Sequence, residues 1–162
     1  MIAAPICVAV ALLTYAGSDA LIWGHIFEAH SMWWADPQYQ AGHKAILWGL
    51  LALGAVALAG CGLRWSAWYA VTFYALSQGG GADLLYYWLD GRAVPAALPW
   101  LDAPGHWLIA HPATPGRLMV QCVVGGLAAA WTARHLDGAP GSRRVAIHGA
   151  EHAPHPNGQT CG

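Results

Sequence analysis

Charged side chains are scarce in this 162-residue chain, and the scarcity excludes several classes of protein. Asp, Glu, Lys and Arg make up 9% of the residues, whereas a soluble globular domain carries about 25%. Hydrophobic residues reach 57%, and the mean hydropathy is positive, at +0.39. The composition therefore disfavours a soluble protein and indicates the lipid bilayer as its surroundings.

Positive charge in excess of negative charge is also lacking. The 7 Lys and Arg are balanced by 8 Asp and Glu, so the chain has no basic surface with which to neutralise phosphates, and we expect no nucleic-acid partner. The cysteines lack a C-x-x-C pair. Their spacing therefore indicates neither a zinc site nor a disulfide framework.

Four apolar stretches are candidates for membrane spans. About 20 mostly apolar residues cross the hydrocarbon core of a bilayer, and such stretches occupy residues 5–27, 44–63, 65–89 and 117–135. The first has no basic n-region, so we interpret it as a retained span rather than a signal peptide. The sequence predicts an all-α, polytopic integral membrane protein with a four-helix transmembrane bundle in residues 1–136.

The remaining segments are expected to lie outside the bundle. Residues 90–116 are too apolar for an exposed loop and contain five prolines, so we expect an interfacial cap before the last helix. Residues 137–162 have the composition of a disordered polar tail. The distribution of basic residues places both termini in the cytoplasm: Arg64, Arg134, Arg143 and Arg144 fall on their side, and Lys44, Arg92 and Arg117 on the other.

Ionisable residues within the predicted spans point to a functional site. Each costs about 2.5 to 3.5 kcal/mol on insertion scales, so it is retained where it faces the bundle interior. The first span carries Asp19 and, near its end, His25 and Glu28. The third span carries Gln78 and a carboxylate in an i, i+3, i+4 cluster that comprises Asp83, Tyr86 and Tyr87.

The His25 and Glu28 pair is open to three interpretations. The carboxylate can orient the imidazole in a proton relay. Alternatively, His25, His30 and His43 are weak candidates for ligands of a metal or a haem. In the third interpretation, the pair makes ordinary hydrogen bonds at the interface near Trp33. None of these spacings identifies a metal site, and the sequence leaves the cofactor unknown.

Three consecutive glycines, residues 79–81, lie inside the third span. Each glycine costs a helix up to about 1 kcal/mol relative to alanine, so the triplet favours a kink or the close approach of another helix. A second interpretation is that the glycines leave room for a ligand beside Gln78 and Asp83.

The residues that follow these glycines resemble a motif of the EXPERA superfamily. The run from Ser77 to Asp90 is similar to its G-Q-x-Y-G-D-x-L-Y segment, and the residues 24–28, GHIFE, resemble the His and acid of its first helix. The segment 33–39, WWADPQY, is similar to the sequence that follows that helix. The likeness covers about residues 15–136. It departs from the family in two respects: no acid occurs in residues 45–60, and the spacing is H-x-x-E rather than H-x-x-x-E.

The resemblance implies a four-helix membrane domain that holds a sterol-like or cationic amphiphile, as in the emopamil-binding sterol isomerases and the sigma-2 receptor. If the isomerase mechanism were retained, it would imply protonation of a ring double bond by an acid near His25. Tryptophan rings and a second carboxylate would then shelter the carbocation. Our own inference is that Asp19 or Asp83 supplies the charge missing from the second helix.

The sequence thus favours an intramembrane pocket for a sterol-, isoprenoid- or amphiphile-like small molecule, with or without isomerase-type acid/base chemistry. The expected catalytic residues are His25, Glu28 and Asp83. The expected ligand-binding residues are Asp19, Gln78, Tyr86, Tyr87 and Trp33. The alternative is a non-catalytic accessory subunit of a larger membrane complex that holds haem or metal through histidine. Either function is compatible with a homo-oligomer or with membrane-complex partners.

Overall fold

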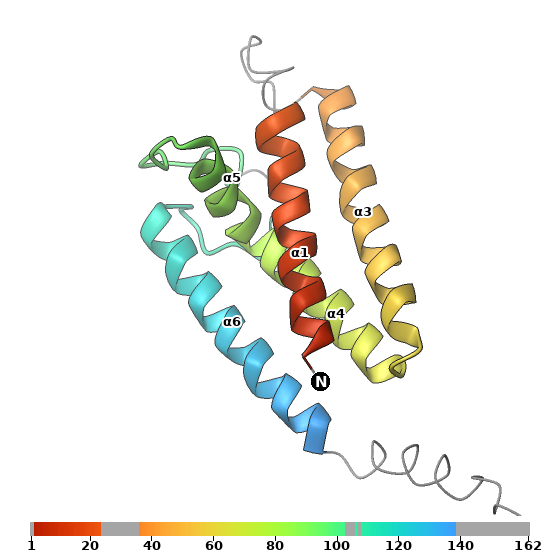
Figure 1. The fold of residues 1–162 in the computed structure, drawn as a ribbon. Helices are drawn as coiled ribbons and strands as arrows, with labels where there is room; N and C mark the ends of the chain where they lie inside the picture. Colours follow the sequence, from red (N-terminus) through yellow and green to blue (C-terminus); the bar gives the residue numbers. More distant parts are fainter. Residues whose placement is uncertain (1, 24–35, 103–105, 107, 139–162) are drawn as a thin grey trace, which may run out of the picture.

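Helices account for all the regular structure in the part of the chain that the computed structural model describes, residues 2–23, 36–102, 106 and 108–138. Successive helices run in opposite directions, with α4 and α5 sharing one direction (Figure 1). The elements are α1 (Ala3–Ser18), the π-helical turn η1 (Asp19–Trp23), α3 (Pro37–Ala59), α4 (Leu63–Leu76), the π-helical segment η3 (Ser77–Gly81), α5 (Ala82–Asp90) and α6 (Pro115–Gly138). The all-α prediction is confirmed for these residues.

Within the described residues, two helical stretches are long and apolar enough to cross a bilayer, Ala3–Leu21 and Pro37–Ala59. Large hydrophobic side chains lie on their outer surfaces, each more than half exposed: Ile6, Val10, Leu53 and Val56. A helix of a soluble protein turns its apolar stripe toward the core and its polar face outward. The outward apolar surface therefore supports a membrane environment.

Helix α3 begins before the span that the hydropathy predicts, which starts at residue 44. The Asp36 side chain accepts hydrogen bonds from the backbone N–H groups of Gln38 (2.7 Å) and Tyr39 (3.2 Å), and Pro37 occupies the first helical position. An aspartate cap followed by proline is a favourable helix start. The extra turns bring Tyr39 and His43 into the bundle.

Helices α3 and α4 form a tight hairpin. Gly62, with φ of +109°, makes the turn between them. The Tyr69 hydroxyl donates a hydrogen bond to the Leu50 carbonyl (2.8 Å), and Ser66 Oγ donates one to the Ala55 carbonyl (2.5 Å). A Cβ atom on Gly54 would lie 2.1 Å from Cζ of Tyr69, so only glycine permits this separation.

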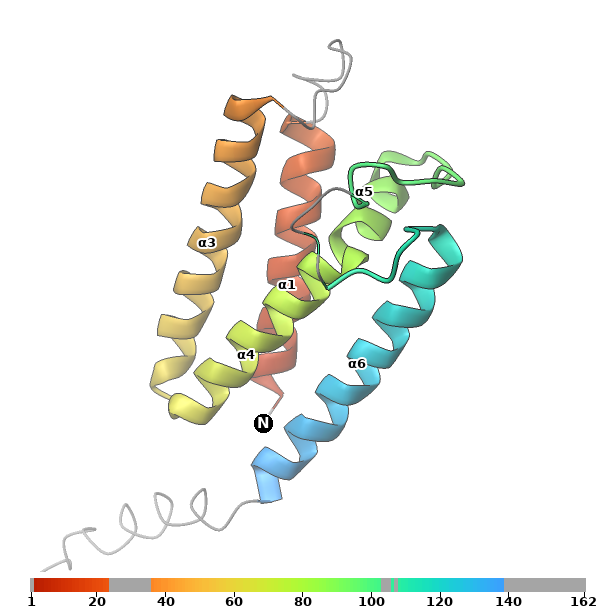
Figure 2. The same ribbon diagram turned by 180° about the vertical axis from the view of Figure 1, so that it is seen from behind.

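The glycine triplet breaks the third helix. Gly80 adopts φ of 87° and ψ of 2°, outside the helical region. A Cβ atom there would lie 2.5 Å from Cδ2 of Leu118 on α6. The kink and the close approach of another helix are therefore both present. Below the kink, α4 lies between α3 and α6 and passes in front of α1 in the view of Figure 2. Trp68 Nε1 donates a hydrogen bond to Thr132 Oγ1 of α6 (2.9 Å).

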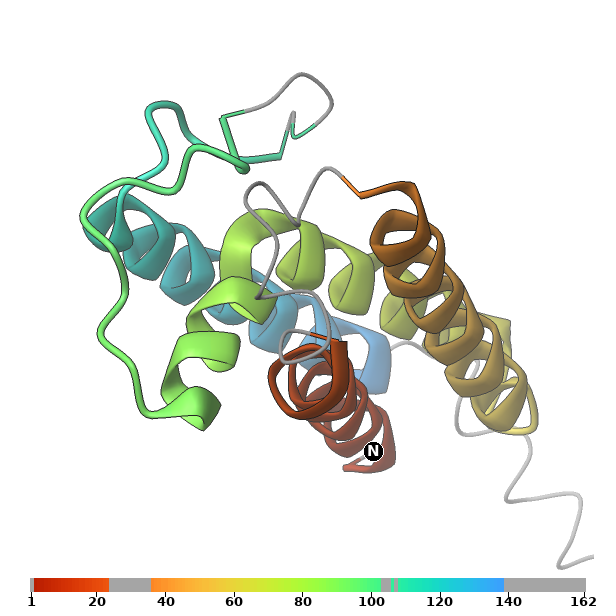
Figure 3. The same cartoon turned by 90° about the horizontal axis from the view of Figure 1, so that it is seen from above.

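The segment between α5 and α6 covers one end of the bundle. Gly91, the C-cap of helix α5, has φ of 70° and reverses the chain. The described residues after it pass along the outer side of α5 and of the start of α6 in the view of Figure 3. It is anchored by buried apolar side chains that pack with Tyr86 and Tyr87: Leu98, Leu101, Ile109 and Ala113. We call residues 91–114 the cap.

Several predicted features lie outside the described residues. They are the predicted sites at His25, Glu28, His30 and Trp33, and the polar tail, of which residues 139–162 fall there.

Candidate functional site

A cluster of polar side chains lies where η1, α3 and α5 approach one another beneath the cap. Asp19 opens η1, and its Oδ1 accepts a hydrogen bond from the Tyr39 hydroxyl of α3 (2.8 Å). His43, one turn further along α3, places Nδ1 3.7 Å from the same oxygen. The side chains of Asp19 and His43 are 13% and 27% exposed. Asp19, predicted as a ligand-binding residue, therefore belongs to a largely buried polar group.

Tyr15 lies one turn before Asp19, on the same side of the helix. It is 1% exposed, and its ring centroid lies 4.6 Å from that of His43. The hydroxyl has no hydrogen-bond partner within the described part of the chain. Its electrostatic neighbours include Asp19, Asp83 and the Gln78 side chain.

Asp83 enters the cluster from the first turn of α5. Its Oδ1 accepts a hydrogen bond from Nε1 of Trp100 in the cap (3.0 Å). Asp19 and His43 are the electrostatic neighbours of the Asp83 carboxyl. The carboxylate is therefore bound to the cap through Trp100, whose ring lies 6.4 Å from that of Tyr87. Tyr86 instead accepts a hydrogen bond from the Arg92 guanidinium (2.8 Å) and packs edge-on against Tyr87.

Both irregular helical segments border this cluster. Asp19 is the first residue of η1, Gln78 lies in η3, and Asp83 follows η3. Segments of π-helix are rare and occur often at functional sites, because the wider turn changes the direction of the side chains that follow it. The glycines of η3 supply the backbone freedom for one of these two irregularities.

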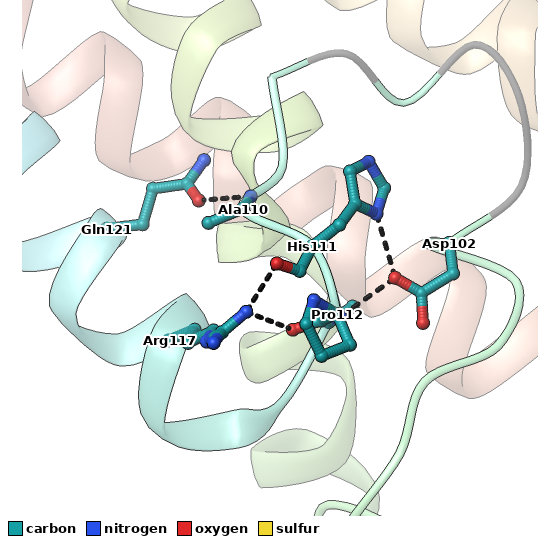
Figure 4. Close-up of polar contacts among 7 residues, drawn as sticks. Asp102, Ala110, His111, Pro112, Arg117 and Gln121 are labelled. Atoms are coloured by element: carbon teal, nitrogen blue, oxygen red, sulfur yellow. Dashed lines mark hydrogen bonds and ion pairs between the residues drawn. The ribbon is translucent and has the colours of Figure 1, made fainter.

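A second polar network fixes the cap onto α6 (Figure 4). Asp102 Oδ1 lies 2.8 Å from Nδ1 of His111 and accepts a hydrogen bond from the backbone N–H of Ala113 (2.8 Å). The bonds to His111 and then to Ala113 lower the pKa of Asp102 from its usual range. Burial, followed by the charges of His111 and His43, lowers the pKa of His106.

Helix α6 completes this attachment with two polar side chains. Arg117 donates to the carbonyl oxygens of His111 and Pro112, and Gln121 bonds both the Ala110 N–H and the Leu108 carbonyl. Because Trp100 belongs to the same cap, the network also positions the indole that binds Asp83. The cap therefore joins the polar cluster to α6.

Metal-binding residues are not gathered in the described ranges. No group of three or more His, Cys, Asp or Glu side chains there is arranged to hold a metal ion. The weak candidate His43 faces Asp19, and the other two, His25 and His30, lie outside those ranges. The resolved cysteines Cys7, Cys61 and Cys122 are free thiols.

Three members of the cluster were missed by sequence reasoning. Tyr15 and Asp19 are four residues apart, and so are Tyr39 and His43, so each pair shares a helix face. That spacing could have identified both tyrosines. Trp100 gave no local signal, because its partner Asp83 is on another element.

Comparison with protein-family models, curated proteins and solved structures finds no match to this chain. The resemblance to the EXPERA superfamily therefore stays a prediction based on its motifs.

Proposed function

We propose that this chain is an integral membrane protein with four spans that binds a hydrophobic small molecule at the polar cluster beneath the cap. The spans are α1, α3, the kinked unit of α4 and α5, and α6. Helix α6 has 24 residues, which at 1.5 Å per residue is about 36 Å, more than the roughly 30 Å of hydrocarbon. Its outer surface is apolar, as at Val120, Val123 and Leu127.

The proposed orientation places the start of α1 and the end of α6 in the cytoplasm. Both lie at the same end of the bundle (Figure 1), as an even number of spans requires. Arg64 and Arg134 belong to that end, and a cytoplasmic location agrees with the positive-inside rule.

The observation that carries the proposal is the placement of Asp19 and Asp83 on separate helices in an otherwise apolar bundle. Within the described residues, His43 is the basic side chain that faces them. Carboxylates at membrane depth are costly to retain, and they mark binding sites or proton pathways. The surrounding Tyr15, Tyr39 and Trp100 offer both rings and polar tips to an amphiphile.

Acid/base chemistry of the isomerase type is a further part of this proposal. Asp83 would act as an acid in the reaction, and His25 and Glu28 would complete the set of catalytic residues that the motif implies. Asp19, which has no counterpart in the motif, would supply the second negative charge that stabilises a cationic intermediate.

Native mass spectrometry of the detergent-purified protein tests the binding proposal. We expect a stoichiometric organic ligand of low mass on the parent protein, and its loss from the Asp83→Asn and Asp19→Asn variants. The matched control is Asp137→Asn, which removes an aspartate at the opposite end of the bundle (Figure 1) and should leave the ligand in place.

Equal ligand occupancy in the parent and in both cluster variants would refute the proposed site. An empty bundle that migrates with other membrane proteins on a native gel would instead favour the accessory-subunit function. Metal analysis and an absorption scan of the same sample test whether that subunit holds haem or metal.

A further inference from the structure

The Tyr15 hydroxyl is the one side-chain group among the described residues that is buried and lacks a hydrogen-bond partner. An unsatisfied hydroxyl inside a protein is destabilising, and native proteins pair nearly all such groups. Tyr15 is also 1% exposed, so bulk solvent does not supply the partner. Its ring lies 4.6 Å from that of His43, whose Nδ1 lies 3.7 Å from Asp19, and both aspartates are among its electrostatic neighbours.

Two other donors of the cluster are already engaged. Tyr39 donates its hydroxyl proton to Asp19, and Trp100 donates its indole proton to Asp83. Each of these two bonds uses Oδ1 of its aspartate. The cluster therefore offers an unused donor at Tyr15, together with the carboxylate oxygens that the bonds from Tyr39 and Trp100 do not occupy.

This inventory distinguishes between classes of polar head group. An ammonium group or a metal ion would interact with the carboxylates but would leave the Tyr15 proton without an acceptor. An ether oxygen accepts from Tyr15 but donates nothing. A hydroxyl group can accept from Tyr15 and donate to a carboxylate oxygen, so it satisfies both sides.

We infer that Tyr15 is a specificity-determining residue of the proposed site, and that it selects a hydrophobic ligand with an oxygen head group, best an alcohol. This inference rests on the proposed function. It goes beyond it because it names the atom that the ligand presents and the residue that reads it. The apolar body of the ligand is left to the surrounding rings and to the bundle.

Three photoreactive probes test the inference. All carry the same 14-carbon chain with an aliphatic diazirine, and their head groups are a hydroxyl, a methyl ether and an ammonium. Labelling of the purified full-length protein is measured by intact mass as a function of probe concentration. In the parent protein we expect the hydroxyl probe to reach half-saturation at the lowest concentration.

The decisive variant is Tyr15→Phe, which removes only the unpaired hydroxyl. We expect the half-saturating concentrations of the hydroxyl and ether probes to rise about threefold to tenfold, as for the loss of one neutral hydrogen bond. The half-saturating concentration of the ammonium probe should not rise. The matched control is Tyr69→Phe, which removes an equally buried hydroxyl that bonds the Leu50 carbonyl away from the cluster. It should leave the order of the three probes unchanged.

Two results would overturn the inference while the proposed site stands. In one, saturable labelling is unaffected by Tyr15→Phe, which would show that water satisfies the hydroxyl. In the other, Tyr15→Phe raises the half-saturating concentrations of all three probes equally, which would indicate a general structural role for Tyr15. The absence of saturable labelling of the parent by every probe would overturn the proposed site and the inference together.

Discussion

Replacement of Gly80 by alanine tests whether the kink between α4 and α5 depends on glycine. Gly80 has φ of 87°, and a non-glycine residue in a left-handed conformation costs about 1 to 2 kcal/mol. The new Cβ atom would also lie 2.5 Å from Cδ2 of Leu118, which is fully buried and has little room to move. Overpacking of a core typically costs about 1 to 3 kcal/mol. We therefore expect Gly80→Ala to lower the free energy of unfolding by about 2 to 5 kcal/mol.

The measurement is denaturation in mild detergent, followed by far-ultraviolet circular dichroism. Gly126→Ala is the matched control, because Gly126 lies within α6 and its added Cβ would meet no atom within 4 Å. This substitution should raise the stability of the protein by about 0.5 to 1 kcal/mol through helix propensity. If Gly80→Ala unfolds at the same denaturant concentration as the parent, neither the left-handed backbone nor the contact with Leu118 is a constraint.

Three further predictions concern the hairpin and the cap. Tyr69→Phe should lower the free energy of unfolding by about 0.5 to 1.5 kcal/mol, because the Leu50 carbonyl loses a donor; an unchanged unfolding midpoint would contradict it. Gly54→Ala should cost about 1 to 3 kcal/mol in the same assay, because its Cβ would overlap the Tyr69 ring, and parental stability would show that the hairpin can widen freely. The cap should become more sensitive to protease as the pH falls. His106 contributes to this below its ordinary pKa of about 6.5, because its lowered pKa means that the released cap binds a proton more readily. Asp102 contributes below about pH 4, as protonation removes a carboxylate whose lowered pKa reflects its stabilisation in the attached cap; cleavage that stays constant from pH 7 to pH 4 would refute the role of His106.

The helices themselves were largely predictable from local sequence. Apolar length located the helices, the glycines marked the kink, and the prolines of residues 90–116 indicated an irregular cap. The start of α3 was misplaced because hydropathy does not detect a polar first turn. Asp36 and Pro37 carried the correct signal, through capping rather than through apolar character.

The composition of the candidate site was predictable only in part. Asp19 and Asp83 were identifiable because a carboxylate stands out in an apolar helix. Their partners were not, since the bond from Tyr39 to Asp19 joins residues 20 apart and the bond from Trp100 to Asp83 joins residues 17 apart. Such pairings depend on how the helices approach one another in space, and spacing along a single helix does not contain that information.

The contrast between near and distant contacts has a consequence for the order of assembly. The α3–α4 hairpin joins neighbours in the chain across a very short turn and forms the most extensive contact between described elements. Contacts that close small loops form early, because they lose little chain entropy. The packing of α1 against α5 closes a much longer loop, so we expect the hairpin to form first and the polar cluster to be completed last. A mutation that slows this final step would leave a protein that is helical but whose polar cluster is still incomplete.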